Sequence, residues 1–140
     1  MIVDASVVID AMADPGSRGV AARAALGAVP SAEPLIAPGH FAFEILSGLR
    51  AVAGRPGYPL AEAEVAPLLS EAEELGVHIE GTPWADVRRA WDISLGSVRY
   101  ADAIYVAAAE RHHTALLTAD ARLARSGTRV SCEIVTVAPS

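Results

Sequence analysis

The sequence opens with MIVDASVVID (residues 1–10), in which a strand pattern passes directly into a helical one. Ile2 and Val3 are β-branched residues that favour a strand, whereas the run Ser6–Met12 has a helical composition. Asp4 therefore lies where a short strand meets a helix. Ligands of parallel α/β sheets bind outside the carboxyl ends of the strands, so Asp4 is a candidate site residue. An aspartate ahead of a helix is equally common as a plain N-cap, and Asp4 alone does not separate the two interpretations.

The size and composition of the chain are those of one α/β domain. Its 140 residues suit a single core, and we assign residues 1–140 to one domain. Hydrophobic residues make up 52% of the chain and aromatic residues only 5%, which is typical of a core built from Ala, Val, Leu and Ile. The chain begins with the strand rather than a secretory signal, and no apolar run reaches the roughly 18 residues of a membrane span. These features predict a cytoplasmic protein.

The charged and reactive residues narrow the possible chemistry. A net charge of −6 argues against a nucleic-acid partner unless several acids bind divalent cations. The single cysteine, Cys132, excludes a disulfide framework and is interpreted as an inert packed residue. The sequence contains no lysine, which excludes phosphoryl-transfer enzymes of the haloacid dehalogenase type, receiver domains and P-loop nucleotide binders. It contains no GxGxxG turn either, so we expect no nucleotide cofactor.

Strand-like and helical segments alternate along the chain. The predicted strands are residues 2–3, 35–37, 77–80, 116–117 and 130–137. The predicted helices are residues 6–12, 17–28, 39–53, 60–75, 83–95 and 100–112, with a short one ending at 125. This order predicts a three-layer α/β/α sandwich with a central parallel sheet and right-handed crossovers.

The predicted helix 83–95 carries an apolar stripe. Thr82 is expected to cap this helix, and Trp84, Val87 and Trp91 share one of its faces. We interpret this face as a packing surface rather than a binding platform, because an amphipathic helix usually buries such a stripe.

Four acids fall where this architecture would bring them together. Asp4 and Asp120 follow predicted strands, Asp102 stands in the first turn of an all-round apolar helix, and Glu44 flanks the apolar stripe of helix 39–53. Each acid alone is also explained as a cap or surface residue. Four carboxylates in one crevice would repel one another unless cations neutralise them, and oxygen ligands select Mg²⁺ or Mn²⁺. Such a metal could activate a water for attack on a phosphodiester.

Four short segments carry a family resemblance. They are MIVDAS at residues 1–6, FEILSGLR around Glu44, YADAIYVAAAE around Asp102, and LLTAD ending at Asp120. Their order and spacing resemble the PIN-domain ribonucleases, and the length of the chain is similar to that of the VapC toxins of bacterial toxin–antitoxin pairs. The resemblance implies a PIN-like fold and a metal-dependent endoribonuclease toxin that uses Mg²⁺ or Mn²⁺ and a metal-activated water.

The resemblance also implies roles for individual positions. The catalytic acids of the family match Asp4, Glu44, Asp102 and Asp120. Asp4 and Asp102 would bind the metal directly, and the other two acids would complete the site, partly through water. Ser6 and Thr118 match small hydroxyl positions that would orient an acid or water, although both residues also suit caps and turns.

The partners implied by the resemblance are an RNA substrate, a second copy of the chain, and a VapB-type antitoxin whose carboxyl-terminal segment covers the active site. Arg99 is the best-placed candidate for an RNA contact, although a surface ion pair is the more frequent role of such an arginine. Other arginines that could hold an RNA backbone are Arg88, Arg89, Arg111, Arg122 and Arg125. No catalytic role is assigned to the histidines, which are His40, His78, His112 and His113.

A second class of function stays open at this point. A PIN-like domain can serve as an RNA-binding or protein-interaction scaffold without cleaving RNA. The presence of all four acids favours the nuclease. Substrate choice depends on loop shape rather than on the acids, so the residues do not name the RNA.

Overall fold

The structure, a computed structural model, describes residues 1–57, 59–126 and 129–139. Its strands form one sheet with the order β3-β2-β1-β4-β5, and every pair of neighbours is parallel. The strands are β1 (Ile2–Val3), β2 (Ile36–Pro38), β3 (His78–Glu80), β4 (Leu116–Thr118) and β5 (Ile134–Thr136). The predicted parallel sheet is therefore confirmed.

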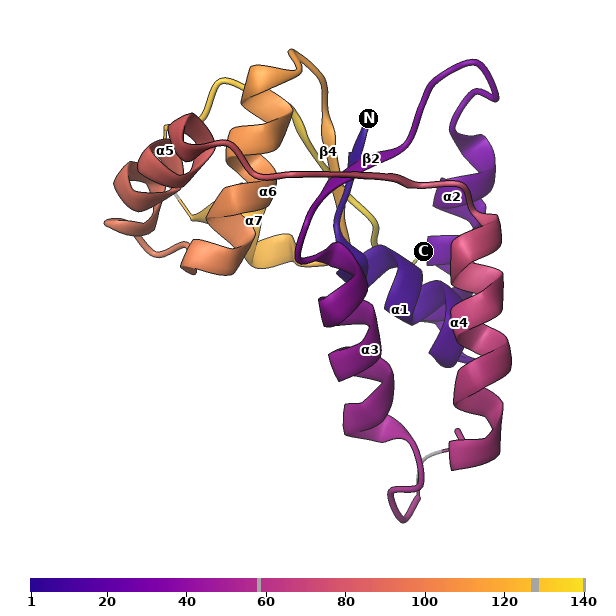
Figure 1. Cartoon of the computed structure of the whole chain (residues 1–140). Coiled ribbons are helices and arrows are strands. Elements are labelled where there is room, and N and C mark those ends of the chain that lie inside the picture. Colours follow the sequence, from indigo (N-terminus) through magenta and orange to yellow (C-terminus); the bar gives the residue numbers. More distant parts are fainter. Residues whose placement is uncertain (58, 127–128, 140) are drawn as a thin grey trace.

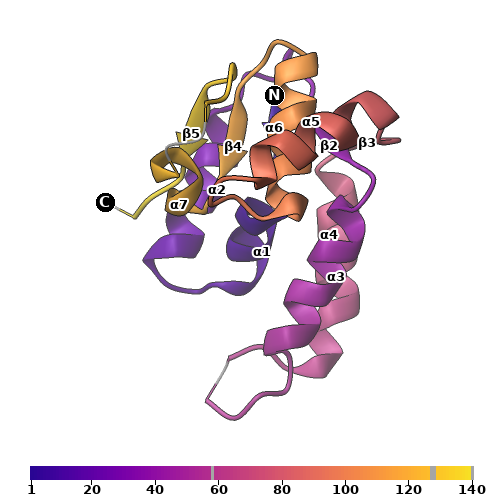
Figure 2. The ribbon, with the colours of Figure 1, turned by 90° about the vertical axis from the view of Figure 1, so that its left-hand side faces the viewer.

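Helices cover both faces of this sheet (Figure 1). They are α1 (Ala5–Ala13), α2 (Ser17–Ala28), α3 (Phe41–Val52), α4 (Val65–Glu74), α5 (Trp84–Ser94), α6 (Tyr100–Arg111) and α7 (Ala121–Arg125), with a 3₁₀ turn, η1 (Glu62–Glu64), before α4. Helices α1–α4 lie on one side, and α5 and α6 on the other, so the three-layer α/β/α prediction is confirmed. The α3–α4 pair extends past the end of the sheet (Figure 2). None of the described helices is long and apolar enough to cross a membrane.

The core lies around β1, β4 and α6. Ile2, Val3 and Leu116 are fully buried, because a central parallel strand is covered on both faces. Helix α6 is buried around its circumference, as its apolar sequence predicts. Because this helix begins at the carboxyl edge of the sheet, its first turn is held rigidly there.

Two predicted elements differ in length from those observed. The acidic segment 60–75 is not one helix, since α4 starts only at Val65; Pro67 cannot donate the backbone hydrogen bond that an earlier start requires. The strand predicted over 130–137 shrinks to β5. Ser131 instead donates its hydroxyl to Glu110 Oε2 at 2.7 Å, and Cys132 lies half-buried outside the strand.

The predicted packing role of the α5 stripe is wrong for the isolated chain. Trp84 is 76% exposed and Trp91 66%, while α5 turns Ala90, Ile93 and Asp86 inward. The reason is polar: Arg111 Nε of α6 donates to both oxygens of buried Asp86 at 3.1 and 3.0 Å. The predicted Thr82 cap is also wrong, because the N-cap residue is Pro83 and no side chain caps the helix.

The sheet order creates a crevice between β1 and β4. From β1 the chain runs outward through β2 to β3, and it then returns to place β4 on the opposite side of β1. The loops after β1 and β4 therefore leave in opposite directions, which opens a ligand-binding position at their carboxyl ends. Asp4 follows β1 and Asp120 follows β4, so both acids border this crevice.

Candidate active site

Asp4 is buried and held in one orientation. Only 5% of the residue is exposed, Thr118 Oγ1 donates to Asp4 Oδ2 at 2.7 Å, and Ser6 N donates to Asp4 Oδ1 at 3.2 Å. The bond from Ser6 makes Asp4 the N-cap of α1. The N-cap interpretation is therefore confirmed, and the same residue borders the crevice after β1.

The two predicted hydroxyl residues join the loops of Asp4 and Asp120. Thr118, at the end of β4, also accepts a hydrogen bond from Asp120 N at 3.1 Å. Ser6 Oγ accepts one from Ala119 N at 3.1 Å. These bonds connect the two loops across the crevice, so the positions of the two acids are coupled.

A buried tyrosine, Tyr105, holds the side chain of Glu44 by a hydrogen bond. Tyr105 Oη donates to Glu44 Oε1 at 2.6 Å and accepts from Ala5 N at 3.4 Å. The ring of His40 packs on Tyr105, with the ring centroids 4.7 Å apart, and His40 Nε2 lies 3.4 Å from Glu44 Oε1. Sequence reasoning missed both supporting residues. A tyrosine within an alanine-rich buried helix was the available signal, since a buried phenol needs a hydrogen-bond partner.

The pKa of Asp102 shows that the acids lie within electrostatic range of one another. Burial raises it most, the carboxylates of Asp4, Asp120 and Glu44 raise it further, and the result is a value of about 6. Burial also raises the pKa of Asp4, against the hydrogen bonds from Thr118 and Ser6. The structure thus brings together the four predicted acids, although they are scattered over more than a hundred positions.

Two arginines border the acids. A small cavity of about 60 Å³ lies between Asp102 and Asp120 and is also lined by Arg99 and Arg122. Hydrogen bonds from Arg122 lower the pKa of Asp120. Arg99 makes no ion pair with any residue that the structure describes, so the surface ion pair expected for it is absent there. Its positive charge nevertheless lowers the pKa values of Asp102 and Asp120.

Other arginines considered for RNA are engaged elsewhere. Arg89 pairs with Glu110 at 3.0 Å, and Arg111 pairs with Asp86 and Glu80. These pairs join α5, α6 and β3 away from the acids. Two of the candidate arginines, Arg99 and Arg122, line the small cavity beside Asp102 and Asp120.

The donor set suits a hard divalent cation. All four acids offer oxygen, and a cation would relieve the repulsion that raises the pKa of Asp102. Among the described residues, however, no three acid, histidine or cysteine side chains are gathered closely enough to form a ready metal site. Asp102 accepts no hydrogen bond from the described part of the chain, whereas the other three acids are engaged. The chemistry of the four acids therefore fits a hard divalent cation, and binding would require their side chains to move closer together.

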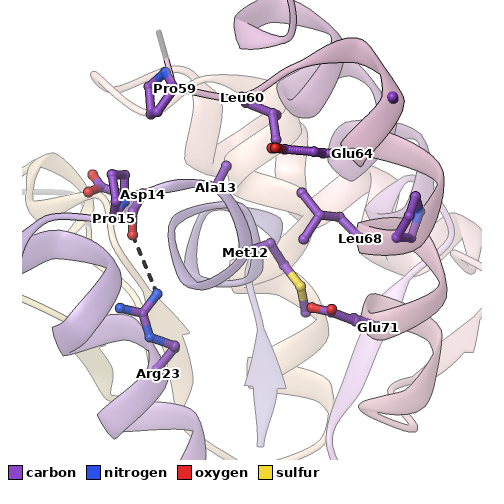
Figure 3. Close-up of a pocket in the computed structure, with 12 residues that line it drawn as sticks. Met12, Ala13, Asp14, Pro15, Arg23, Pro59, Leu60, Glu64, Leu68 and Glu71 are labelled. Carbon is purple, nitrogen blue, oxygen red and sulfur yellow. Dashed lines mark hydrogen bonds between the residues drawn. The ribbon is translucent and has the colours of Figure 1, made fainter.

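A second cavity is not lined by any of the four acids, and Figure 3 shows it. It has a volume of about 480 Å³ and opens between the end of α1 and the η1–α4 segment. Met12, Leu60 and Leu68 supply apolar surface, and Glu64 and Glu71 supply negative charge. Asp4 is at the other end of α1, roughly 13 Å away along a nine-residue helix.

The chain is similar to known proteins. Residues 1–127 match the family model of the PIN domain. The chain is 33% identical to Ribonuclease VapC3 of Mycobacterium tuberculosis over 126 residues, which cover 90% of this chain and 86% of that protein.

Two solved structures share the fold. M. tuberculosis VapC20, a toxin that cleaves the sarcin-ricin loop, aligns with a TM-score of 0.69 and 14% identity over 91% of this chain and 95% of its own. A toxin–antitoxin complex from Klebsiella pneumoniae aligns with a TM-score of 0.69 and 18% identity over 99% of this chain and 98% of the matched chain. At these identities the structures support the fold alone. The family model and the identity with VapC3 go further, and the chain belongs to the PIN-domain family, among the VapC ribonucleases.

Proposed function

We propose that this chain is a metal-dependent endoribonuclease and the toxin of a type II toxin–antitoxin pair. One observation carries the proposal: hydrogen bonds through Thr118 and Tyr105 link Asp4 and its neighbour Ala5 to Asp120 and Glu44, and Asp120 shares a cavity with Asp102 at the carboxyl edge of a parallel sheet. We take residues 1–140 as one PIN domain that acts in the cytoplasm, where cellular RNA is found.

The four acids would divide the work of the site. Asp4 and Asp102 would bind Mg²⁺ or Mn²⁺ directly, and Glu44 and Asp120 would complete the site, partly through water. The metal supplies charge neutralisation and a more acidic water for hydrolysis. Asp4 needs no reorientation because Thr118 and Ser6 already hold its two oxygens. Preorganisation of this kind lowers the cost of reaching the transition state.

The residues around the acids orient the acids and the substrate and do not themselves react. The Tyr105 hydroxyl directs Glu44 toward the crevice, since the 2.6 Å bond fixes Oε1. Arg99 lines the cavity beside Asp102 and faces the place where an RNA phosphate would approach. Its planar guanidinium can hold two phosphate oxygens at once.

The decisive experiment measures RNA cleavage by the purified chain with Mg²⁺, with Mn²⁺ and with EDTA. Cleavage that needs metal and disappears in Asp4→Ala supports the nuclease. Glu74→Ala is the matched control, because Glu74 is an exposed acid of α4 outside the site. RNA binding without cleavage in any metal would favour the scaffold alternative. Equal cleavage by wild type and Asp4→Ala would refute the assigned site.

The antitoxin is proposed to be a VapB-type protein whose carboxyl-terminal segment lies over the acids and offers an arginine to them. The negative crevice favours such a cation. The cavity of Figure 3 is a second surface for the same partner, because its apolar walls and two glutamates suit an apolar segment with basic residues. Coexpression with the product of the neighbouring gene should yield a complex, and Leu68→Glu should weaken it. An unchanged complex would remove the cavity from the interface.

We also propose that the chain forms a homodimer through α5. Trp84, Val87, Trp91 and Leu95 form one exposed stripe at helical spacing. The two tryptophans alone leave roughly 300 Å² of aromatic surface in water, against about 800 Å² per partner in a standard interface. Light scattering should report a dimer for wild type and a monomer for Trp84→Ser/Trp91→Ser. A monomeric wild-type chain would refute the proposal.

A further inference from the structure

Asp120 is paired with an arginine of its own helix. Arg122 Nε donates to Asp120 Oδ1 at 3.0 Å, and Arg122 Nη2 donates to Oδ2 at 2.9 Å. The backbone N of Arg122 also donates to Oδ1 at 2.9 Å. Both carboxylate oxygens are thus engaged by one residue, in the two-point geometry that arginine forms best.

The pair follows from the local sequence. Asp120 is the N-cap of α7, and Arg122 follows two positions later, so its side chain can fold back over the cap. The Arg122 side chain is 69% exposed and that of Asp120 21%. Both residues line the small cavity that Asp102 also borders. The contact therefore lies at the solvent rim of the acid site, where an ion pair is weak enough to exchange.

The pair conflicts with the role proposed for Asp120. Three donors occupy the oxygens of Asp120, and the positive guanidinium repels a second cation, so Arg122 competes with a divalent ion for this carboxylate, whereas the donors on Asp4 are neutral. Of the four, Asp102 is left without a hydrogen bond in the described residues, and Asp120 is neutralised from within the chain.

We propose that Arg122 is an internal competitor that the divalent cation must displace from Asp120. The inference rests on the proposed metal-dependent function and adds a residue to it. While the pair is formed, Asp120 is withheld and metal binding is weakened. Binding of a cation would require the guanidinium to release both oxygens of Asp120. Arg122 is a positioning residue in this scheme, because it acts on the metal through Asp120.

The opposite role is physically possible and predicts the opposite sign. If Arg122 instead held Asp120 in the orientation needed for metal binding, its removal would weaken binding. Loss of a positive charge also favours cations in a general way, so the test needs a charge-matched control. Arg125 provides one, because it is an exposed arginine of the same helix with no recorded contact to a site acid.

The test measures Mn²⁺ affinity by titration calorimetry. We expect R122Q to bind Mn²⁺ about two- to fivefold more tightly than R125Q, because the cation no longer has to break an exposed ion pair and such pairs are of that strength. R122K keeps the charge but cannot form the two-point contact, so its affinity should lie between those of wild type and R122Q. In the D120N background, R122Q should gain nothing over D120N alone. NMR of the Arg122 Nε–H group should show its hydrogen bond lost on saturation with Mg²⁺.

Two results would overturn the inference, and they are distinguishable from failure of the proposed function. Mn²⁺ affinity of R122Q equal to or weaker than that of R125Q would show that Arg122 does not compete, while metal-dependent cleavage by wild type could stand. Persistence of the Arg122 Nε–H hydrogen bond at saturating Mg²⁺ would have the same meaning. If the wild-type protein bound no metal, both the proposed function and this inference would be refuted.

Discussion

Asp102→Asn should stabilise the metal-free protein at neutral pH. Burial and three neighbouring carboxylates raise the pKa of Asp102 from 3.8 to about 6, so ionised Asp102 is disfavoured in the folded state. A group with a raised folded pKa contributes stability below its unfolded pKa and loses it as pH rises through the folded value. Wild-type protein should therefore lose this stability as the pH rises from about 4 to about 6.

The magnitude follows from the pKa difference. Two units correspond to about 3 kcal/mol before screening by solvent. Asp102 is only half-buried, so we discount this value to roughly 1–2 kcal/mol. For a chain of this size, that free energy raises Tm by about 3–6 °C. Asparagine has nearly the same shape as aspartate, so the change removes the charge with little change in packing.

The assay is thermal unfolding of wild type and Asp102→Asn in EDTA from pH 4 to pH 8. The difference in stability should be near zero at pH 4 and should reach its full value by pH 7. Asp92→Asn, at an exposed position on α5, is the control for loss of an acid outside the site. Mg²⁺ at ten times its Kd should stabilise wild type by about 1.4 kcal/mol and Asp102→Asn by less. A variant that is less stable than wild type at pH 7, or a difference that does not change with pH, would refute the reasoning.

Three further substitutions test the support of the site. Thr118→Val should lower the free energy of unfolding, measured in urea, by about 1–3 kcal/mol, because buried Asp4 loses its 2.7 Å donor. Thr118→Ser should recover most of the lost stability. An equal loss in both variants would argue against the hydrogen bond. Tyr105→Phe should slow RNA cleavage roughly tenfold in a single-turnover assay, since Glu44 loses the hydroxyl that orients it. An unchanged rate would show that Tyr105 does not support catalysis. Gly19→Ala should lower Tm markedly, because a Cβ there would lie 1.8 Å from the Asp14 carbonyl oxygen. Gly27→Ala is the control and should be neutral or stabilising, because a Cβ there has nothing within 4 Å. Equal Tm values for the two variants would contradict this packing.

Local patterns predicted most elements because those elements depend on short stretches of chain. The β-branched Ile2 and Val3 indicated β1, and the all-round apolar α6 indicated a buried helix, which the structure confirms. Alternation of strands and helices then indicated the fold class, since helical crossovers are the usual connections between parallel strands. Boundaries depended on longer-range contacts, as the Ser131 bond to Glu110 at the start of β5 illustrates.

Site geometry was only partly accessible from sequence. Asp4 and Asp120 could be placed together because both follow strands of a parallel sheet. Tyr105 and Arg122 could not be assigned, because their partners are defined by how α6 and α7 meet the loops after β1 and β4. The inward face of α5 likewise contains an ion pair between Asp86 and Arg111 of α6, a partner that the sequence of α5 alone does not show.

The sequence by itself determined the order of the elements, the identity of the acids and the absence of any lysine chemistry, since these are properties of the linear chain. Tertiary structure alone decided which hydrogen bond each acid receives and which arginine reaches it. A carboxylate becomes a ligand, a cap or half of an ion pair according to the few ångströms around its two oxygens, and those distances are set by segments far apart in the chain.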